Sequence, residues 1–416
     1  MTSPGTIVTV AIVARWLFCL VIFPNFLTGI ATVGDQYTFD SYREIAAQLL
    51  AGNGYRVAPE AIPCLHRPPG YVAVLLVSFP ASELAYLFAQ FWNGLLGGLA
   101  TWATITMGRL WGLSRLAASM AGYGVALWPF LVWETKITVP ENLLVALLPL
   151  VFVALGRWRG SGAPEWLVVA GALAGLTTLT HGLYQVLLPA LCLTILTFGD
   201  RPRRWSAVVV LCLAYGAMVT PWLVRNAQVA GQPMGVATGF GMHYLRGLQS
   251  WSVLTSGEPY FRDHDPEMAA VHQRLAQAGF DTSDDDFMRS DPATNRFLDG
   301  VAWDDVRARP GNLVLRAVVR APLLWVQQQT ASRSLVTALL LLPLFLLAAR
   351  GLLRHWQLQL LGPFVTLVGL NLTIAAICPE AIPMRYGLPL MPLLCLFAAR
   401  GLPQGAATRK GSEIVA

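Results

Sequence analysis

Residues Val33 to Tyr71 read VGDQYTFDSYREIAAQLLAGNGYRVAPEAIPCLHRPPGY, a polar segment marked by glycine and proline between two long apolar runs. The segment places Asp35, Asp40 and the cationic Arg67 just outside the first apolar run. Charged groups at the edge of a membrane span are costly to keep there and often serve function. This segment is therefore the first candidate for a functional site, and the apolar runs around it decide the fold.

The composition is that of an integral membrane protein. Of 416 residues, 55% are apolar or aromatic and only 12% are charged, against about 25% charged residues in soluble proteins. The net charge of +6 arises from short basic clusters between apolar runs, where membrane topology accounts for them. Nucleic-acid binding is therefore not expected.

Apolar runs long enough to cross a bilayer recur along the chain. At about 20 residues per span, the sequence predicts an all-α polytopic membrane protein with about ten transmembrane helices. The fifth and sixth runs are short and meet at His181, so a broken or re-entrant pair is an alternative. The predicted spans are 7–32, 83–107, 116–133, 139–156, 165–181, 183–199, 205–225, 334–350, 357–377 and 384–401.

Arginine and lysine fall on alternate short loops, which sets the expected orientation. By the positive-inside rule, those loops and both termini are cytoplasmic. We expect the cell inner (plasma) membrane, with the active site on the extracytoplasmic face. The predicted divisions are a transmembrane catalytic module at 1–225 with a first outward loop at 33–82, an outward loop at 226–333, C-terminal transmembrane helices at 334–402, and a cytoplasmic tail at 403–416.

The long outward loop holds most of the acidic residues and resembles a soluble subdomain. Helical spacing predicts helices at 265–280, 297–306 and 312–326. The last of these is amphipathic and is expected to lie along the membrane surface. Asp284 to Asp286 is interpreted as a solvated turn, because no fixed spacing of metal ligands accompanies it.

The two aspartates of the first outward loop differ in how well a structural role explains them. Asp40 precedes a predicted amphipathic helix at 41–50, where it would help to cap the first turn, with Ser41 and Glu44 forming a capping box. Capping alone is thus the alternative to catalysis for Asp40. Asp35 has a weaker structural explanation, and the choice between them stays open.

Cations and further carboxylates are predicted on the same outward face. Two prolines follow Arg67 and restrict the local backbone, which suits a guanidinium presented to a phosphate or carboxylate. Contact with lipid headgroups is the alternative. Glu134, Lys136 and Glu141 share the next outward turn, and Pro140 begins a helix that places Glu141 in its first turn.

Polar groups also mark the outward ends of later spans. Arg225 and Asn226 end the seventh span, Arg385 and Tyr386 open the tenth, and His181 lies between the fifth and sixth. A packing or hydrogen-bonding histidine is the alternative to function for His181.

Three other features complete the expectations from the residues. Arg15 lies inside the first apolar run and is expected to extend to the cytoplasmic surface. Cys64 and Cys378 fall in outward loops, where they could pair in an oxidising compartment. Signatures of soluble enzymes, namely a phosphate loop, paired zinc ligands and a nucleophile elbow, are absent.

Several sequence stretches, taken in order, resemble the GT-C fold glycosyltransferases. The resemblance is closest to the family 39-like branch, which includes protein O-mannosyltransferases and the bacterial aminoarabinose transferase of lipid A. It runs through nearly the whole chain and is carried by the acidic loop after the first span and by YREIAAQLLAGNGY at 42–55, RPPGY at 67–71, Pro140–Glu141, AGALAGLTTLT at 170–180, PWLVRN at 221–226 and RYGLP at 385–389.

The resemblance implies a transferase that takes a sugar from a polyprenyl-phosphate donor and passes it to a lipid, glycan or protein acceptor, with inversion at the anomeric carbon. A carboxylate of the first outward loop would act as general base, and cations would hold the phosphate. No metal ligands are assigned, and a divalent cation, Mg or Mn, is left open. The implied assignments are Asp40 or Asp35 as base, Arg67, Arg225, Arg385 and Lys136 on the donor phosphate, and Glu141, Glu134, Tyr71, Asn226, Tyr386 and His181 in the sugar or acceptor pocket.

The chain departs from the family pattern at two positions. Thr38 stands where the family commonly has its aspartate, and His181 stands where it often has an arginine. Two other functions are weighed: a carrier or flippase for lipid-linked sugars, which would show repeated halves and charges deep in the spans, and a polymerase or ligase that uses a diphosphate-linked donor.

Overall fold

The computed structural model describes residues 3–22, 41–78, 85–198, 201–256, 266–327, 331–377 and 383–402. Within these ranges every regular element is a helix, so the prediction of an all-helical chain is confirmed. Asp35, Asp40, Cys378 and the predicted tail at 403–416 lie outside the described residues. The choice of catalytic base therefore stays a prediction. The expected pairing of Cys64 with Cys378 is wrong, because Cys64 is a buried free thiol whose Sγ lies 3.4 Å from the His66 Nδ1.

The apolar helices of the first half form one packed bundle. α1 continues into a short π-helical segment, η1 (Phe18–Ile22), while α10 and α11 are joined by the 3-10 turn η2 (Gly182–Val186). α10 lies between α9 and α12, and α6 lies between α1 and α9. The bounds are α1 Pro4–Leu17, α6 Ala85–Leu110, α7 Arg115–Leu127, α8 Pro129–Glu134, α9 Glu141–Ser161, α10 Glu165–Thr180, α11 Leu187–Phe198 and α12 Arg201–Ala230.

The C-terminal helices complete this bundle. α19 (Ala331–His355) and α7 both pack on α22 (Met391–Arg400), which is buried along its whole length. α20 (Leu361–Ile377) packs against α11, and the short helices α21 (Pro383–Gly387) and η4 (Leu388–Leu390) lead into α22. The end of the chain is thus inserted among helices from its beginning.

Four helices are long and apolar enough to cross a membrane, namely Pro4–Val21, Glu141–Ser161, Arg204–Ala230 and Ser332–His355. Three shorter apolar helices, Glu165–Thr180, Gly182–Thr197 and Leu361–Ile377, accompany them. This agrees with a membrane protein. The number of about ten spans remains a prediction.

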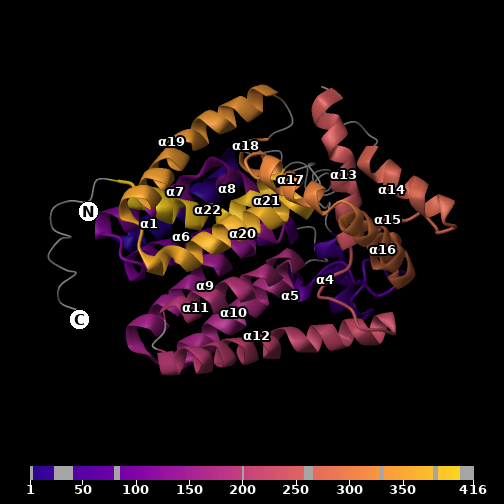
Figure 1. Cartoon of the computed structure of the whole chain (residues 1–416), viewed down its shortest axis with the longest axis horizontal. Helices are drawn as coiled ribbons and strands as arrows, with labels where there is room; N and C mark the ends of the chain where they lie inside the picture. The colour runs from indigo at the N-terminus through magenta and orange to yellow at the C-terminus, as the bar shows by residue number, and fades with distance from the viewer. Residues whose placement is uncertain are drawn as a thin grey trace.

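Most helices of the predicted outward loops gather at one end of the bundle, on the right of Figure 1, while α17 and α18 lie nearer the centre of the view. The predicted helices at 41–50 and 265–280 are confirmed within three residues, and the one at 297–306 lies within the longer helix α16. The single helix predicted at 312–326 is wrong, because the chain divides there into α17 and α18 before Leu323. Helices α5, α13 and α15 were not predicted. These elements are α4 Tyr42–Leu50, α5 Pro69–Leu76, α13 Phe240–Ser256, α14 Pro266–Gln277, α15 Asp285–Ser290, α16 Pro292–Ala308, α17 Pro310–Arg320 and α18 Leu323–Val326.

Two local predictions in these loops are wrong. The solvated turn at Asp284 to Asp286 is instead the start of helix α15, and the Asp284 carboxylate accepts a hydrogen bond from the Phe287 backbone N–H at 3.3 Å. Ser41 does precede α4, but its backbone is left-handed, with φ 54°, and its side chain does not cap the helix. A cap needs extended backbone at this position, so the capping box does not form.

The prediction that Arg15 reaches the cytoplasmic surface is also wrong. Its side chain is buried and donates to the backbone oxygens of Ala126 at 2.8 Å and Val125 at 3.1 Å, at the end of α7. Pro129 has no N–H, so the Val125 oxygen has no donor four residues later. Arg15 therefore supplies a hydrogen bond that the proline removes.

Candidate active site

An ion-pair cluster brings together three predicted site residues from separate segments. The Arg385 Nε lies 3.0 Å from the Glu141 Oε2 and 3.9 Å from the Glu134 Oε1. Glu134 ends α8, Glu141 begins α9, and Arg385 lies on α21. Glu141 is only 1% exposed. Two carboxylates and a guanidinium thus share a buried region at the predicted outward end of the bundle.

Buried amide side chains fix the turn between the two glutamates. The Asn142 Nδ2 donates to the backbone oxygens of Glu134 at 3.2 Å and Ile137 at 3.0 Å. Asn93, on α6, donates to the Ile137 oxygen at 3.0 Å, and its own oxygen accepts from the Tyr71 hydroxyl at 3.2 Å. Neither asparagine was predicted from the sequence, although an amide within an apolar helix is the signal that could have identified them.

Lys136 lies in the same turn. Its Nζ is 3.5 Å from the centroid of the Trp133 ring, which is a cation–π contact. Burial lowers the pKa of Lys136 to about 8, while the nearby Glu134 acts in the opposite direction. Lys136 is therefore mainly protonated at neutral pH but more readily deprotonated than an exposed lysine.

Arg67 is positioned by aromatic side chains of the first outward loop. Its guanidinium carbon lies 5.2 Å from the Tyr42 ring centroid, and Tyr42 packs edge-on against Tyr71. The Tyr55 hydroxyl donates to the Arg67 backbone oxygen at 2.9 Å. The two prolines after Arg67 start α5, as their fixed φ favours.

Arg225 and Asn226 hold the first outward loop against the end of α12. Arg225 donates from Nη1 to the Cys64 backbone oxygen at 2.7 Å. Its guanidinium carbon lies 5.2 and 4.7 Å from the centroids of the Tyr55 and Trp222 rings, which also contact each other edge-on. Asn226 donates to the Gly235 oxygen at 2.9 Å. Both predicted site residues thus make contacts that order the chain around Arg67.

His181 and Tyr386 lie near the ion-pair cluster. The His181 ring packs edge-on against Tyr386 at 6.0 Å, and its Nδ1 accepts the Leu183 backbone N–H at 3.4 Å. The guanidinium carbon of Arg385 is 5.8 Å from the Tyr386 ring centroid. His181 therefore makes the packing and hydrogen-bonding contacts that were considered as the alternative to a functional role. Its packing partner, Tyr386, directly follows Arg385 in the sequence.

A second cationic group was missed in the sequence analysis. It comprises Arg246 on α13, Arg289 on α15 and Arg67, which lie around the buried side chain of His243 on α13. Burial lowers the pKa of His243 well below its usual value, and the charges of Arg246, Arg289 and Arg67 add to this effect. Like charges disfavour protonation. Three arginines from three segments of the chain thus lie around His243 at this end of the protein.

Hydrogen bonds between neighbouring residues bring these segments together. The Thr238 N–H donates to the Leu65 oxygen at 3.1 Å, and its hydroxyl donates to the Arg289 oxygen at 2.5 Å. The His66 Nδ1 and the Ser290 Oγ are 2.8 Å apart. The residues beside Arg67 and Arg289 are thus in contact. The signal in the sequence was a histidine and an arginine three positions apart in the long loop, which share one face of a helix.

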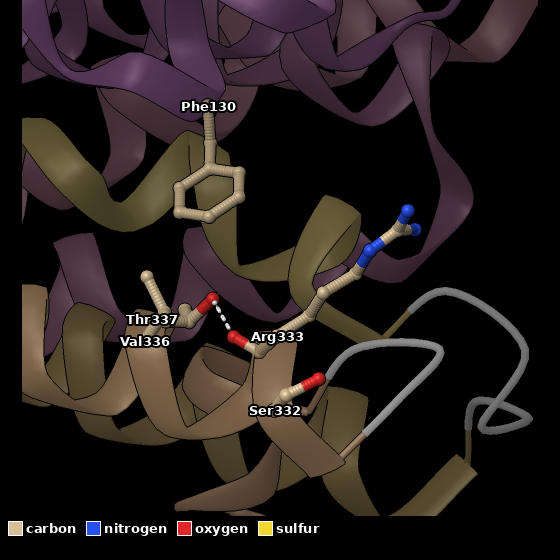
Figure 2. Close-up of a pocket in the computed structure, with 5 residues that line it drawn as sticks. All are labelled: Phe130, Ser332, Arg333, Val336 and Thr337. Atoms are coloured by element: carbon tan, nitrogen blue, oxygen red, sulfur yellow. Dashed lines mark hydrogen bonds between the residues drawn. The ribbon is translucent and has the colours of Figure 1, made fainter.

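Figure 2 shows a pocket of about 290 Å³ between α8 and the first turn of α19, lined by Phe130, Ser332, Arg333, Val336 and Thr337. The Thr337 hydroxyl donates to the Arg333 backbone oxygen at 2.8 Å, so it is turned toward its own helix. Phe130 precedes Glu134 by one helical turn on α8. The pocket is mainly apolar, with a cation at its edge, and it lies one turn from the ion-pair cluster.

The described residues contain no group of three or more histidine, cysteine, aspartate or glutamate side chains that could hold a metal ion. Asp35 and Asp40 lie outside these ranges. The question of a divalent cation therefore stays open, as in the sequence analysis.

No family model matches the sequence, and no curated protein matches it either. Among solved structures, the oligosaccharyltransferase AglB of Archaeoglobus fulgidus, in complex with an inhibitory peptide and a dolichol-phosphate, aligns over 96% of this chain with 14% identity and a TM-score of 0.52. The same enzyme tethered to an acceptor peptide also gives a TM-score of 0.52, at 13% identity. This chain covers 50% of the AglB chain, so it spans about half of that protein's length.

ArnT of Cupriavidus metallidurans, bound to undecaprenyl phosphate, aligns over 88% of this chain and 74% of its own, with 18% identity and a TM-score of 0.40. AglB and ArnT are both GT-C fold glycosyltransferases. The alignment with AglB carries the fold assignment, because its TM-score is the higher. The chain has the GT-C fold, which confirms the fold implied by the resemblance.

Proposed function

We propose that this protein is a membrane glycosyltransferase that moves a sugar from a polyprenyl-phosphate donor to an acceptor on the extracytoplasmic face, with inversion. The observation that carries the proposal is the GT-C fold together with a cationic group and a buried carboxylate cluster at the end that bears the predicted outward loops. A donor that carries a phosphate needs cations, and an acceptor hydroxyl needs a base.

The cationic side chains form two groups by their place in the structure. Arg385 already pairs with Glu141 at 3.0 Å, so we assign it to shaping the sugar or acceptor pocket with Glu134 and Glu141. Arg67, Arg246 and Arg289 lie around His243. We assign the donor phosphate to this second group, with Arg225 holding the Arg67 loop in place.

In the proposed reaction, Asp40 or Asp35 takes the proton of the acceptor hydroxyl while its oxygen attacks the anomeric carbon of the sugar. The bond from the anomeric carbon to the phosphate oxygen breaks, and the bonding pair leaves with that oxygen. Polyprenyl phosphate is released with one more negative charge than the bound phosphodiester carried. The arginines stabilise this charge as it develops.

The pocket of Figure 2 supports a lipid-linked donor. Phe130 and Val336 give it an apolar wall, while Arg333 supplies a cation at the edge. A volume near 290 Å³ is at the lower end for ligand sites, so it would take only a short part of a polyprenyl chain.

The base assignment can be tested with purified protein and a polyprenyl-phosphate donor whose sugar is labelled. We expect the Asp35→Asn, Asp40→Asn double variant to lose transfer by about 100-fold or more, as general bases contribute. Asp304→Asn, at a position where the carboxylate is 79% exposed, is the matched control and should retain wild-type transfer. Full turnover by the double variant would show that neither aspartate is the base.

A further inference from the structure

Tyr71 connects the two parts of the proposed active site without being exposed to a ligand. It was expected in the sugar or acceptor pocket, but its side chain is fully buried, at 0% exposure. Its hydroxyl donates to the Asn93 Oδ1 at 3.2 Å. A buried side chain acts on a reaction through the groups that it holds, so the contacts of Tyr71 define its role.

On one side, Tyr71 is packed together with the residues that position Arg67. Its ring lies edge-on against Tyr42, with centroids 5.6 Å apart, and the guanidinium carbon of Arg67 lies 5.2 Å from the Tyr42 centroid. Gly70 allows α5 to lie directly against the end of α10, because a Cβ on this glycine would be 2.5 Å from the Thr180 Oγ1. The positions of Tyr71 and Arg67 are therefore set together.

On the other side, Asn93 of α6 holds the turn that joins Glu134 to Glu141. Its Nδ2 donates to the backbone oxygens of Thr135 at 3.1 Å and Ile137 at 3.0 Å. Asn93 is only 2% exposed, and hydrogen bonds are stronger in such an environment of low dielectric constant. A displacement of the Asn93 amide would therefore displace the turn between the two carboxylates of the ion-pair cluster.

The hydrogen bonds of Asn93 fix the direction of its amide group. Backbone oxygens can only accept, so the NH2 group faces the turn and the Oδ1 faces Tyr71. The tyrosine hydroxyl, which is protonated at neutral pH, is then the donor to this oxygen. Without the hydroxyl, the Asn93 side chain would lose the contact that holds it from the side of α5.

We propose that Tyr71 and Asn93 are positioning residues, whose hydrogen bond aligns the donor-phosphate arginines with the carboxylates of the sugar or acceptor pocket. This inference rests on the proposed transferase function. Consecutive contacts lead from the Arg67 guanidinium through the rings of Tyr42 and Tyr71 and the Asn93 amide to the turn after Glu134.

This alignment matters for the rate of transfer more than for binding. Sugar transfer requires the attacking oxygen and the anomeric carbon to lie about 3–3.5 Å apart, and a misplacement of about 1 Å costs about 100-fold in rate. The donor phosphate and the acceptor each keep their own contacts when the link between the two parts is lost. We therefore expect loss of the link to lower kcat and to leave the KM for the donor nearly unchanged.

The first experiment compares sugar transfer by wild type and Tyr71→Phe, with undecaprenyl phosphate carrying a labelled sugar as donor and a membrane extract as the source of acceptor. The substitution keeps the ring and removes only the hydroxyl. We expect kcat to fall about tenfold, as for the loss of one hydrogen bond, while the KM for the donor changes less than twofold. Asn93→Asp should lose more, because a carboxylate cannot donate to the two backbone oxygens. Tyr215→Phe is the matched control, since it removes a tyrosine hydrogen bond of 3.1 Å, to the Thr178 Oγ1, elsewhere in the bundle; it should retain the wild-type kcat.

The second experiment measures backbone hydrogen exchange by mass spectrometry and needs no substrate. Amides of the turn, such as the Ile137 N–H that donates to the Glu134 oxygen at 3.0 Å, report how firmly the turn is held. We expect exchange at 135–142 to be about tenfold faster in Tyr71→Phe than in wild type, and unchanged in Tyr215→Phe. Exchange in the rest of α9 should stay at the wild-type rate, which shows that the variant is folded.

Three results would overturn the proposal. They are an unchanged kcat in Tyr71→Phe when wild type transfers sugar, a loss confined to the KM for the donor, and unchanged exchange at 135–142. The two experiments also separate this inference from the proposed function. If wild type transfers no sugar while the turn exchanges faster in Tyr71→Phe, the proposed function fails and the hydrogen-bond link between the two parts of the site stands.

Discussion

Replacing Glu141 by glutamine removes the charge from the shortest ion pair of the candidate active site while keeping its size. The pair is 3.0 Å long, with exposures of 1% for Glu141 and 12% for Arg385. Removing one partner of a buried pair costs about 3–5 kcal/mol, because the other charge stays buried. In this variant the Glu134 carboxylate, 3.9 Å from the Arg385 Nε, still balances part of the arginine's charge. We therefore expect a loss at the low end, about 3 kcal/mol.

The loss can be measured as the free energy of unfolding in mixed detergent micelles under reversible conditions. Glu165→Gln is the matched control, since this glutamate is exposed at the start of α10, and it should change stability by less than about 0.5 kcal/mol. The Glu141→Gln, Arg385→Met double variant should lose less than the sum of the single variants. A loss below about 1 kcal/mol for Glu141→Gln, as for an exposed pair, would refute the buried ion pair.

Three further predictions follow from other side chains. Replacing Arg15 by methionine should destabilise the protein by about 3 kcal/mol or more, because the proline-ended α7 loses its donor; an unchanged unfolding free energy would contradict this. Because the pKa of Lys136 is lowered to about 8 in the folded state, the unfolded state binds more protons above that pH. Wild type should therefore gain stability relative to Lys136→Met between pH 7 and about 10, and parallel pH curves would exclude the shift. Replacing Arg246 or Arg289 by glutamine should raise the KM for the donor about tenfold, as loss of a charge-assisted hydrogen bond does, and should weaken inhibition by free polyprenyl phosphate; unchanged values would remove them from the phosphate site.

The sequence predicted local elements well where one helix face is apolar. The amphipathic pattern at 41–50 placed α4 within one residue of its bounds, and the proline before Glu141 placed the start of α9 within one residue. The end of α9, predicted at 156, lies at Ser161. Helix α13 was missed because it mixes aromatic, polar and basic residues without a clear apolar stripe. Arg15 was misplaced because its acceptors lie at the end of another helix, at Val125 and Ala126.

The candidate site was predicted as a set of residues but not as an arrangement. The predicted membrane topology placed Glu134, Glu141 and Arg385 on the same side of the membrane. Their contact depends on the packing of the helices that carry them, which no local sequence pattern encodes. The same holds for Arg67 and Arg289, whose segments meet through hydrogen bonds between distant parts of the chain. Side-chain amides such as that of Asn93 hydrogen-bond to the backbone of a distant segment. The sequence around such an asparagine gives little indication of that partner.

The most direct test of the central claim follows the fate of the donor. Purified protein would receive undecaprenyl phosphate carrying a labelled sugar, with a membrane extract as the source of acceptor. We predict that label moves to the acceptor while free undecaprenyl phosphate appears in equal amount, and that the Asp35→Asn, Asp40→Asn double variant produces neither. Two results would contradict the proposed function. One is that protein in vesicles only moves the intact donor across the membrane, and the other is that transfer occurs solely from a diphosphate-linked donor.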